Sequence, residues 1–281
     1  MCIKNEKENR FYFVFMFFFC AYSQVYYKAS QRDTLGAFHL RVSYEMKFIP
    51  DTLDRTNFDK RNMVLHIGKN GLSCYMERNK WIRDSIGNAR IVDGKVSDRD
   101  IDDARRLAGR VYDNYQILKS YPDSEHLSFL GYAGLDKFEY KENPDFNWQL
   151  KSAEKKTIGG YKCSLAMGSY AGRAYKVWYT TEISVSDGPW KFRGLPGLIL
   201  EVEDLSGEYY YTCTKIQKRE GLIIVEGMDN VFKTTRERFL KAFQRSKEDP
   251  GAIIQSLGNK VQGDVLKKKR AKRAYNPQEK Y

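Results

Sequence analysis

The chain has few of the residues on which metal sites and common enzyme motifs depend. Its 281 residues include only three histidines, His39, His66 and His126, and none has a histidine, cysteine or carboxylate at metal-ligand spacing. An imidazole-based zinc or iron centre is therefore not expected, and we assign no metal and no cofactor. The sequence also lacks H-E-x-x-H, C-x-x-C, G-x-S-x-G, G-x-G-x-x-G and P-loop patterns. Because these patterns mark frequent hydrolase, redox and nucleotide sites, we assign no catalytic residues and do not expect an enzyme.

Long hydrophobic runs are also scarce, and the one present lies at the amino end. Residues 11–20 are all apolar, follow Lys4, Lys7 and Arg10, and precede Ala21-Tyr22-Ser23, a small-x-small cleavage pattern. Ten helical residues reach only about half of a ~30 Å hydrocarbon core. We interpret residues 1–23 as a signal peptide cut before Gln24, and expect export to a periplasmic or extracellular compartment.

Cysteines are too few for a disulfide scaffold. Of the five in the chain, three follow the expected cleavage point, namely Cys74, Cys163 and Cys213. At most one disulfide can form among three thiols, and the sequence leaves open whether any two are bridged. Cys163 and Cys213 lie in apolar stretches, where buried cysteine packs as a small hydrophobic residue.

Positive charge is present in excess, and about half of it lies at the carboxyl end. The formal net charge is +12, and residues 260–281 hold eight basic and two acidic side chains, a net of +6. Export argues against a nucleic-acid partner for this basic C-terminal tail. A solvated tail is the simpler interpretation, and attraction to envelope proteins or to anionic lipid and glycolipid surfaces is the alternative.

Strand patterns dominate the remainder, residues 24–259. Apolar residues alternate from Phe38 to Phe48, and Gly68-Lys69-Asn70-Gly71 joins two short apolar runs as a hairpin turn would. Two further hairpins are predicted, with strands over 160–166 and 174–179, then 198–202 and 209–216. Helices are predicted after Ser97, with an apolar face from Ile101 to Tyr115, and from Thr234 to Pro250, with a short one at 253–257. We expect one α+β domain with a predominantly antiparallel, curved, half-barrel-like sheet and a few helices packed on it.

Four aspartates crowd the start of the helix that follows Ser97. They are Asp98, Asp100, Asp102 and Asp103, but the glycine and the later glutamate of a calcium-binding loop are missing. Carboxylates at this position favour the positive end of a helix dipole, which is the interpretation that we prefer.

Two turn signals close together mark the candidate site. Gly188-Pro189 and Leu195-Pro196-Gly197 each favour a turn, because proline fixes φ and glycine tolerates the left-handed region. Between them Trp190 and Phe192 alternate with Lys191 and Arg193. As a binding site these four residues would offer aromatic surface to an apolar ligand and cations to its anionic end. The structural interpretation, which we prefer, is that the aromatics close the end of the sheet while the cations stay in solvent.

The same region resembles the GLPGLI family of exported bacterial proteins. Gly194-Leu195-Pro196-Gly197-Leu198-Ile199 spells the hexapeptide that names the family. The neighbouring matches, in the order that the family shows, are Gly160-Tyr161-Lys162-Cys163, Gly172-Arg173, Trp178-Tyr179-Thr180, Glu182-Ile183 and Gly188-Pro189-Trp190-Lys191-Phe192, with Asn276-Pro277 and Glu279 at the end. Members often differ at Thr181, Ser184, Leu165 and Gln278. The resemblance implies an envelope setting and supplies no catalytic residues, and the Gly-Leu-Pro-Gly corner is also similar to curved half-barrels of the lipoprotein-carrier type.

These observations favour a non-enzymatic binding or assembly module for an apolar, lipid-like ligand or a protein partner. The alternatives are a hydrolase of an envelope polymer, using carboxylates such as Asp187, Glu201, Glu203 and Asp204, and a structural partner that pairs through a sheet edge. Sequence alone does not identify the ligand, the partner or the oligomeric state.

Overall fold

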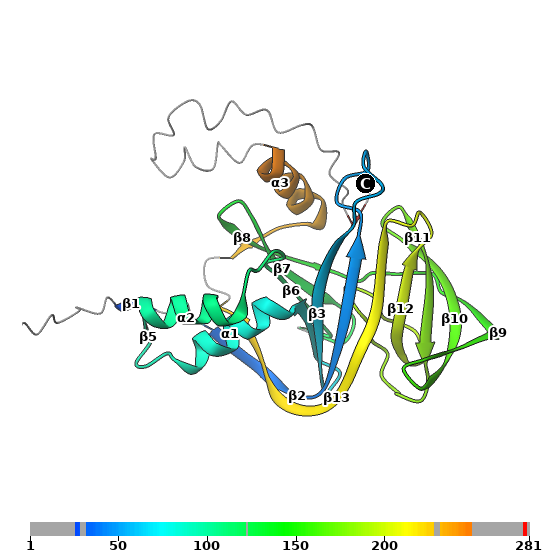
Figure 1. Ribbon diagram of the computed structural model, residues 1–281, viewed down its shortest axis with the longest axis horizontal. Coiled ribbons are helices and arrows are strands. Elements are labelled where there is room, and N and C mark those ends of the chain that lie inside the picture. Colours follow the sequence, from blue (N-terminus) through cyan, green and yellow to red (C-terminus); the bar gives the residue numbers. More distant parts are fainter. Residues whose placement is uncertain (1–25, 29–31, 122, 228–230, 249–277, 280–281) are drawn as a thin grey trace, which may run out of the picture.

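Twelve strands form one curved sheet in the computed structural model, which describes residues 26–28, 32–121, 123–227, 231–248 and 278–279 (Figure 1). The strand order is β14-β8-β7-β6-β4-β3-β2-β13-β12-β11-β10-β9. In chain order the strands are β2 (Arg32–Phe48), β3 (Asp59–Gly68), β4 (Ser73–Glu77), β6 (Tyr115–Lys119), β7 (Leu127–Ala133), β8 (Asp136–Glu142), β9 (Gln149–Ile158), β10 (Tyr161–Tyr170), β11 (Arg173–Thr180), β12 (Leu198–Asp204), β13 (Tyr209–Glu226) and β14 (Phe232–Lys233). Every pairing is antiparallel except that of β14 with β8. The expectation of a predominantly antiparallel, curved sheet is therefore confirmed.

The two longest strands, β2 and β13, pair in the middle of the sheet and join its two halves. Their register shifts at three places along the ladder, and such bulges bend strands and increase their twist. Both strands curve along their length (Figure 1). The sheet stays open, because β9 and β14 occupy opposite edges.

The hairpins predicted from turn residues are present. The turn between β3 and β4 has Gly71 at a φ of 82°, the conformation for which glycine is suited. The predicted pairs 160–166 with 174–179 and 198–202 with 209–216 correspond to β10–β11 and β12–β13. Local turn chemistry thus positions most of the second half of the sheet.

Of the three described helices, α1 (Arg78–Ala89) and α3 (Arg236–Glu248) pack on the sheet, whereas α2 (Asp98–Ala108) packs on α1 and on a small ladder of β1 (Tyr26–Lys28) and β5 (Lys95–Ser97). The helix predicted from Thr234 is α3. The one predicted after Ser97 is α2, whose first turn is capped by the Ser97 hydroxyl. It ends earlier than predicted, because Gly109 adopts a φ of 79° and Tyr115 already belongs to β6. The helical share is smaller than the α+β expectation implied.

Helix α1 (Arg78–Ala89) was not predicted from the sequence. Its buried positions are Lys80 and Asp84, which form an ion pair, with Nζ 2.7 Å from the carboxylate. An amphipathic helix is normally recognised in a sequence by a stripe of apolar residues, whereas the buried positions of α1 are charged.

Hydrophobic side chains cover both faces of the sheet. Ile117 and Phe129 belong to a large core cluster that α3 covers through Phe239, whereas their neighbours Leu118 and Leu130 belong to a smaller cluster. The smaller one is partly covered by Trp81 of α1. Because neighbouring residues on a strand point to opposite faces, α1 and α3 lie on opposite sides of the sheet.

Residues 1–23, the predicted short helix at 253–257 and most of the basic C-terminal tail lie outside the described residues. The predicted boundaries at Gln24 and at residue 260 therefore remain predictions. None of the described helices is long and apolar enough to cross a membrane.

Candidate functional site

A loop of residues 187–197, between β11 and β12, carries the candidate site. Asp187 pairs with Arg193 as an isolated bridge, and Phe192 donates its N–H to the Pro189 carbonyl at 3.0 Å. Trp190, which lies between Pro189 and Phe192 in this turn, has a φ of 46°. A bulky residue in this region is strained by about 1–3 kcal/mol, and the surrounding structure must hold it there.

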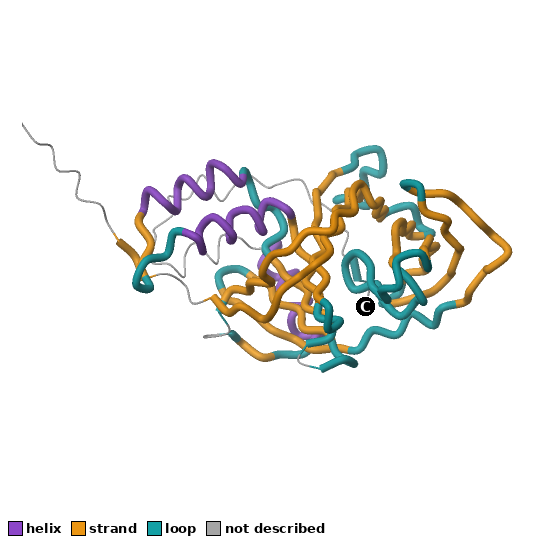
Figure 2. Tube along the Cα trace, turned by 90° about the horizontal axis from the view of Figure 1, so that it is seen from below, coloured by secondary structure: helices purple, strands orange, loops and turns teal. Residues whose placement is uncertain are grey.

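The aromatic residues of the 187–197 loop belong to the main hydrophobic core. Trp190, Phe192 and Leu195 are all buried. The Phe192 ring lies 4.9 Å from that of Tyr175 and 5.0 Å from that of Phe146. Burial of these apolar side chains provides the stabilisation that offsets the strained turn. The strands arc around loop segments at this end of the molecule (Figure 2).

Lys119 of β6 fixes one end of the 187–197 loop. Its Nζ lies 2.6 Å from the Asp187 carboxylate, 2.6 Å from the Gly188 carbonyl and 3.0 Å from the Phe192 carbonyl. The side chain is almost fully buried, and burial lowers the pKa of Lys119 although Asp187 acts in the opposite direction. A buried lysine with three oxygen acceptors has its donors fully used, so Lys119 has a positioning role.

Lys191, in the loop itself, is a second buried cation at this site, with an exposed fraction of 0%. Its ammonium group forms ion pairs with Glu142 of β8 and with Glu279, and donates to the Tyr140 hydroxyl at 3.0 Å. The alternation of residues 190–193 predicts a solvent-exposed lysine. The structure differs because the loop turns at Trp190 instead of continuing as a strand, so consecutive residues do not alternate between core and solvent.

Glu279 reaches this site from the carboxyl-terminal end of the chain. It is 5% exposed and forms ion pairs with Lys191 and with Arg236 of α3. The preceding residue, Gln278, donates its side-chain amide to the hydroxyl of Tyr211 on β13. Glu279 thus contacts the loop at a residue 88 positions earlier in the chain, and Gln278 contacts the sheet at a residue 67 positions earlier.

Two tyrosines complete the surroundings of Lys191. The Tyr170 hydroxyl donates a hydrogen bond to Glu142 at 2.5 Å, and the Tyr140 hydroxyl accepts one from the Lys191 ammonium group. Burial, followed by the negative charges of Glu142 and Glu279, raises the pKa of both phenols. Both therefore stay neutral, and the site consists of two cations, two carboxylates and neutral hydroxyls.

The other residues of the predicted motif have several environments. Arg193 is half-buried and donates to the Ser124 carbonyl at 2.7 Å. Within the motif, Gly188, Pro189, Leu195, Gly197, Leu198 and Ile199 are buried, and Gly194 and Pro196 are exposed. Gly197 passes so close to β11 that a Cβ atom placed there would lie 2.1 Å from the Thr180 carbonyl oxygen. The last glycine of the hexapeptide is therefore required for close backbone approach.

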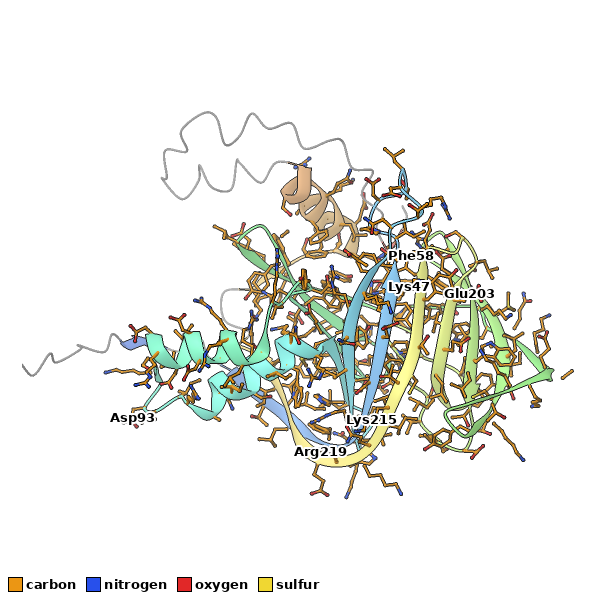
Figure 3. The ribbon with its side chains drawn as sticks, in the orientation of Figure 1. Lys47, Phe58, Asp93, Glu203, Lys215 and Arg219 are labelled. Carbon is orange, nitrogen blue, oxygen red and sulfur yellow. The ribbon has the colours of Figure 1, made fainter. Side chains whose placement is uncertain are left out.

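The carboxylates suggested for a hydrolase do not meet. Asp187 is paired with Lys119 inside the protein, Asp204 with Arg173, and Glu201 with Lys156 on the surface at 2.7 Å. Glu203 lies on β12, where it is half-buried (Figure 3). Among the described residues, no three or more His, Cys, Asp or Glu side chains gather as a metal site would require. Cys74, Cys163 and Cys213 are all free thiols.

Sequence reasoning missed four residues. Glu142, Arg236 and Glu279 surround Lys191, and Lys119 holds the 187–197 loop through Asp187. Each comes from a different part of the chain, so no spacing pattern joins them. One signal was available, because Asn276-Pro277 and Glu279 match the usual ending of the family that the chain resembles.

The comparisons with known proteins agree with the family resemblance over a short range. Residues 171–201 match the model of a family described as "Protein of unknown function (Porph_ging)". That range runs from the β10–β11 turn through the 187–197 loop into β12. No curated protein matches the chain.

Solved structures give low similarity. Two crystal forms of PNGF-II have TM-scores of 0.46 and 0.49 at 12% identity, over 74% of this chain and 33% of theirs. MucB in complex with MucA(peri) has a TM-score of 0.26 at 4% identity, over 64% and 50%. A LolA superfamily protein from Nitrosomonas europaea has a TM-score of 0.25 at 8% identity, over 64% and 86%. The chain thus spans about a third of the length of the PNGF-II structures.

Proposed function

We propose that this chain is an exported, non-enzymatic binding module that holds a carboxylate-bearing chain segment against Lys191. One observation carries the proposal: a fully buried lysine meets a glutamate delivered by a segment remote in sequence. A buried ammonium is costly unless it is paired, and Glu279 adds a second carboxylate to the one that Glu142 of β8 supplies. The contacts that hold Glu279 also suit an acidic segment of a protein partner.

The geometry favours a peptide over the other candidates. An apolar ligand would have to displace Trp190, Phe192 and Leu195, which already fill the core at this site. Peptide recognition by a cation and by amide-to-hydroxyl contacts requires only what Lys191, Arg236 and Tyr211 already provide.

Pairing through a sheet edge receives less support. The exposed edge strand β9 carries Lys151, Lys155 and Lys156, and its register with β10 shifts once. Charged side chains and bulges at an edge act against the addition of another strand. We therefore place the partner at the Lys191 site.

Peptide binding in trans tests the proposal. A labelled peptide of residues 276–281 should bind the full chain carrying Glu279→Gln at least about tenfold more tightly than it binds the unchanged chain, whose own segment competes at high effective concentration. The matched control is the same peptide with glutamine at position 279, which should bind neither chain. Equal binding of the two peptides would exclude recognition of the carboxylate.

Export is a separate part of the proposal and needs its own test. It depends on residues 1–23, so amino-terminal sequencing of the protein from its native cells should begin at Gln24. An uncleaved chain in the cytosolic fraction would contradict export and leave the peptide site untouched.

A further inference from the structure

A second group of cations and aromatic rings lies on the opposite face of the sheet, beneath α1. Arg41 of β2 pairs in register with His66 of β3, and the Arg41 guanidinium lies over the ring of Trp81 on α1, 4.1 Å from its centroid. The ring of Phe38 lies 5.5 Å from the same guanidinium. Arginine between aromatic faces is held by cation–π attraction and by planar stacking.

His66 orients the guanidinium further. Arg41 donates from Nε to His66 Nε2 at 3.2 Å. Burial, and then the positive charge of Arg41, lower the pKa of His66 to about 3, so the ring is neutral and accepts this hydrogen bond. The His66 ring itself stacks on Phe38, with centroids 4.1 Å apart. With Nε engaged and the plane fixed, the two terminal NH2 groups of Arg41 keep their donors for another acceptor.

The counter-ion that such an arginine normally has is missing from the described part of the chain. Most half-buried cations in the described residues form an ion pair with a carboxylate. Arg83 pairs with Asp84, for example, and Arg236 pairs with Glu279. The charged groups near Arg41 are instead arginines. Arg219 lies two positions after Gln217, the register partner of Arg41 on β13, and Arg78 lies three positions before Trp81 on α1, so each shares a face with a neighbour of Arg41. Burial, and then the charges of Arg219 and Arg78, lower the pKa of Arg41. Within residues 32–121, 123–227 and 231–248, neither Arg78 nor Arg219 forms an ion pair.

From this arrangement we propose that Arg41, Arg78 and Arg219 form a binding site for a phosphate group. Three like charges repel one another, and a dianionic oxyanion between them would relieve that repulsion. Guanidinium groups match phosphate because each offers two parallel N–H donors. Arg219 lies at the lower bend of β13, where it is exposed to an approaching anion (Figure 3). The source of the phosphate can be a free anion or a lipid head group, and the experiment separates them.

The indole N–H of Trp81 reports directly on the site. The chain has four tryptophans, so nitrogen-15 labelling gives four indole signals, and Trp81→Phe identifies the one of interest. Titration with inorganic phosphate should move the Trp81 signal to saturation. Arg41→Gln should abolish the shift, and Arg219→Gln, an exposed position that leaves the core intact, should weaken binding about tenfold.

Lys47→Gln is the matched control. Lys47 lies on the same strand as Arg41 and also covers an aromatic ring, that of Phe58 at 4.0 Å, but it lies near the carboxyl end of β2, whereas Arg41 lies in the middle (Figure 3). This variant should bind phosphate as the unchanged chain does. A shift that does not saturate, or that Arg41→Gln and Arg219→Gln leave unchanged, overturns the proposal.

Vesicles distinguish the source. Arg219-dependent co-sedimentation with vesicles of phosphatidylglycerol and phosphatidylcholine, but not with phosphatidylcholine alone, assigns a lipid head group. Saturable binding of free phosphate without such co-sedimentation assigns a soluble anion. Either result supports the site, and Arg219→Gln separates it from vesicle attraction due to the basic C-terminal tail.

Discussion

The ammonium group of Lys119 lies 2.6 Å from the carboxylate of Asp187, 68 positions later in the chain. Both side chains are buried. This pair ties β6 to the 187–197 loop, and thus ties one half of the sheet to the segment that fills the core of the other half.

Lys119→Met should destabilise the protein by about 3–5 kcal/mol, because it leaves the Asp187 carboxylate buried without a partner. Urea unfolding measures the loss. Lys156→Gln is the control, since it breaks a partly exposed pair with Glu201 and should cost less than about 1 kcal/mol. Similar losses in the two variants would mean that the buried pair does not hold the loop.

Gly197→Ala should cost more than about 4 kcal/mol or prevent folding, because the new Cβ would lie 2.1 Å from a backbone oxygen of Thr180. Gly159→Ala provides the comparison. Gly159 has a φ of 57° and open space around it, so alanine there should cost only about 1–2 kcal/mol of backbone strain. Thermal unfolding of both variants checks the difference, and a mild effect at position 197 would contradict the close approach.

The outline of the sheet could be predicted, because β2 alternates apolar and polar residues and the hairpin turns contain glycine at the left-handed positions. Helix α1 could not, because it buries Lys80 and Asp84 in place of an apolar stripe. The candidate loop was found from its turns. The burial of Lys191 could not be predicted from the sequence. It depends on the carboxylates of Glu142 and Glu279, and no local pattern connects these residues to Lys191.

Acid should weaken the protein through Glu226. Burial alone would raise the pKa of this carboxyl group, but Lys80, the Tyr132 hydroxyl and Lys137 lower it to about 2. The unfolded chain therefore binds the proton more tightly, and the stabilisation that is complete above about pH 4.5 disappears as the pH falls toward 2. The loss amounts to about 3 kcal/mol.

Glu226→Gln isolates that contribution. The variant should be less stable than the unchanged chain at neutral pH, and the difference between the two free energies of unfolding should shrink as the pH falls through this window. A difference that stays constant from about pH 6 to about pH 2 would show that Glu226 does not contribute through its charge.

His66 should stay neutral where an ordinary histidine titrates. Its pKa is lowered to about 3 by burial and by Arg41, so its ring signals in NMR spectra should not move between about pH 8 and about pH 5. Because the unfolded chain takes up this proton below about pH 6.5, folding stability falls as the pH decreases from there toward 3. In Arg41→Gln the pKa should rise but stay well below 6.5, since burial is the larger cause. A midpoint near 6.5 in the unchanged chain would contradict the buried, neutral ring.

The pairing of β2 with β13 also determines when the protein can fold. The register of this ladder runs from Phe48 with Tyr209 to Arg32 with Glu226, so it joins residues 161 to 194 positions apart. In a chain that emerges amino end first from a ribosome or a translocation channel, β2 cannot complete its pairing with β13 until Glu226 has emerged. Until then β2, a strand of 17 residues with one apolar face, has one edge without its partner strand. We therefore expect the protein to fold slowly and to be prone to aggregation while this edge of β2 is unpaired.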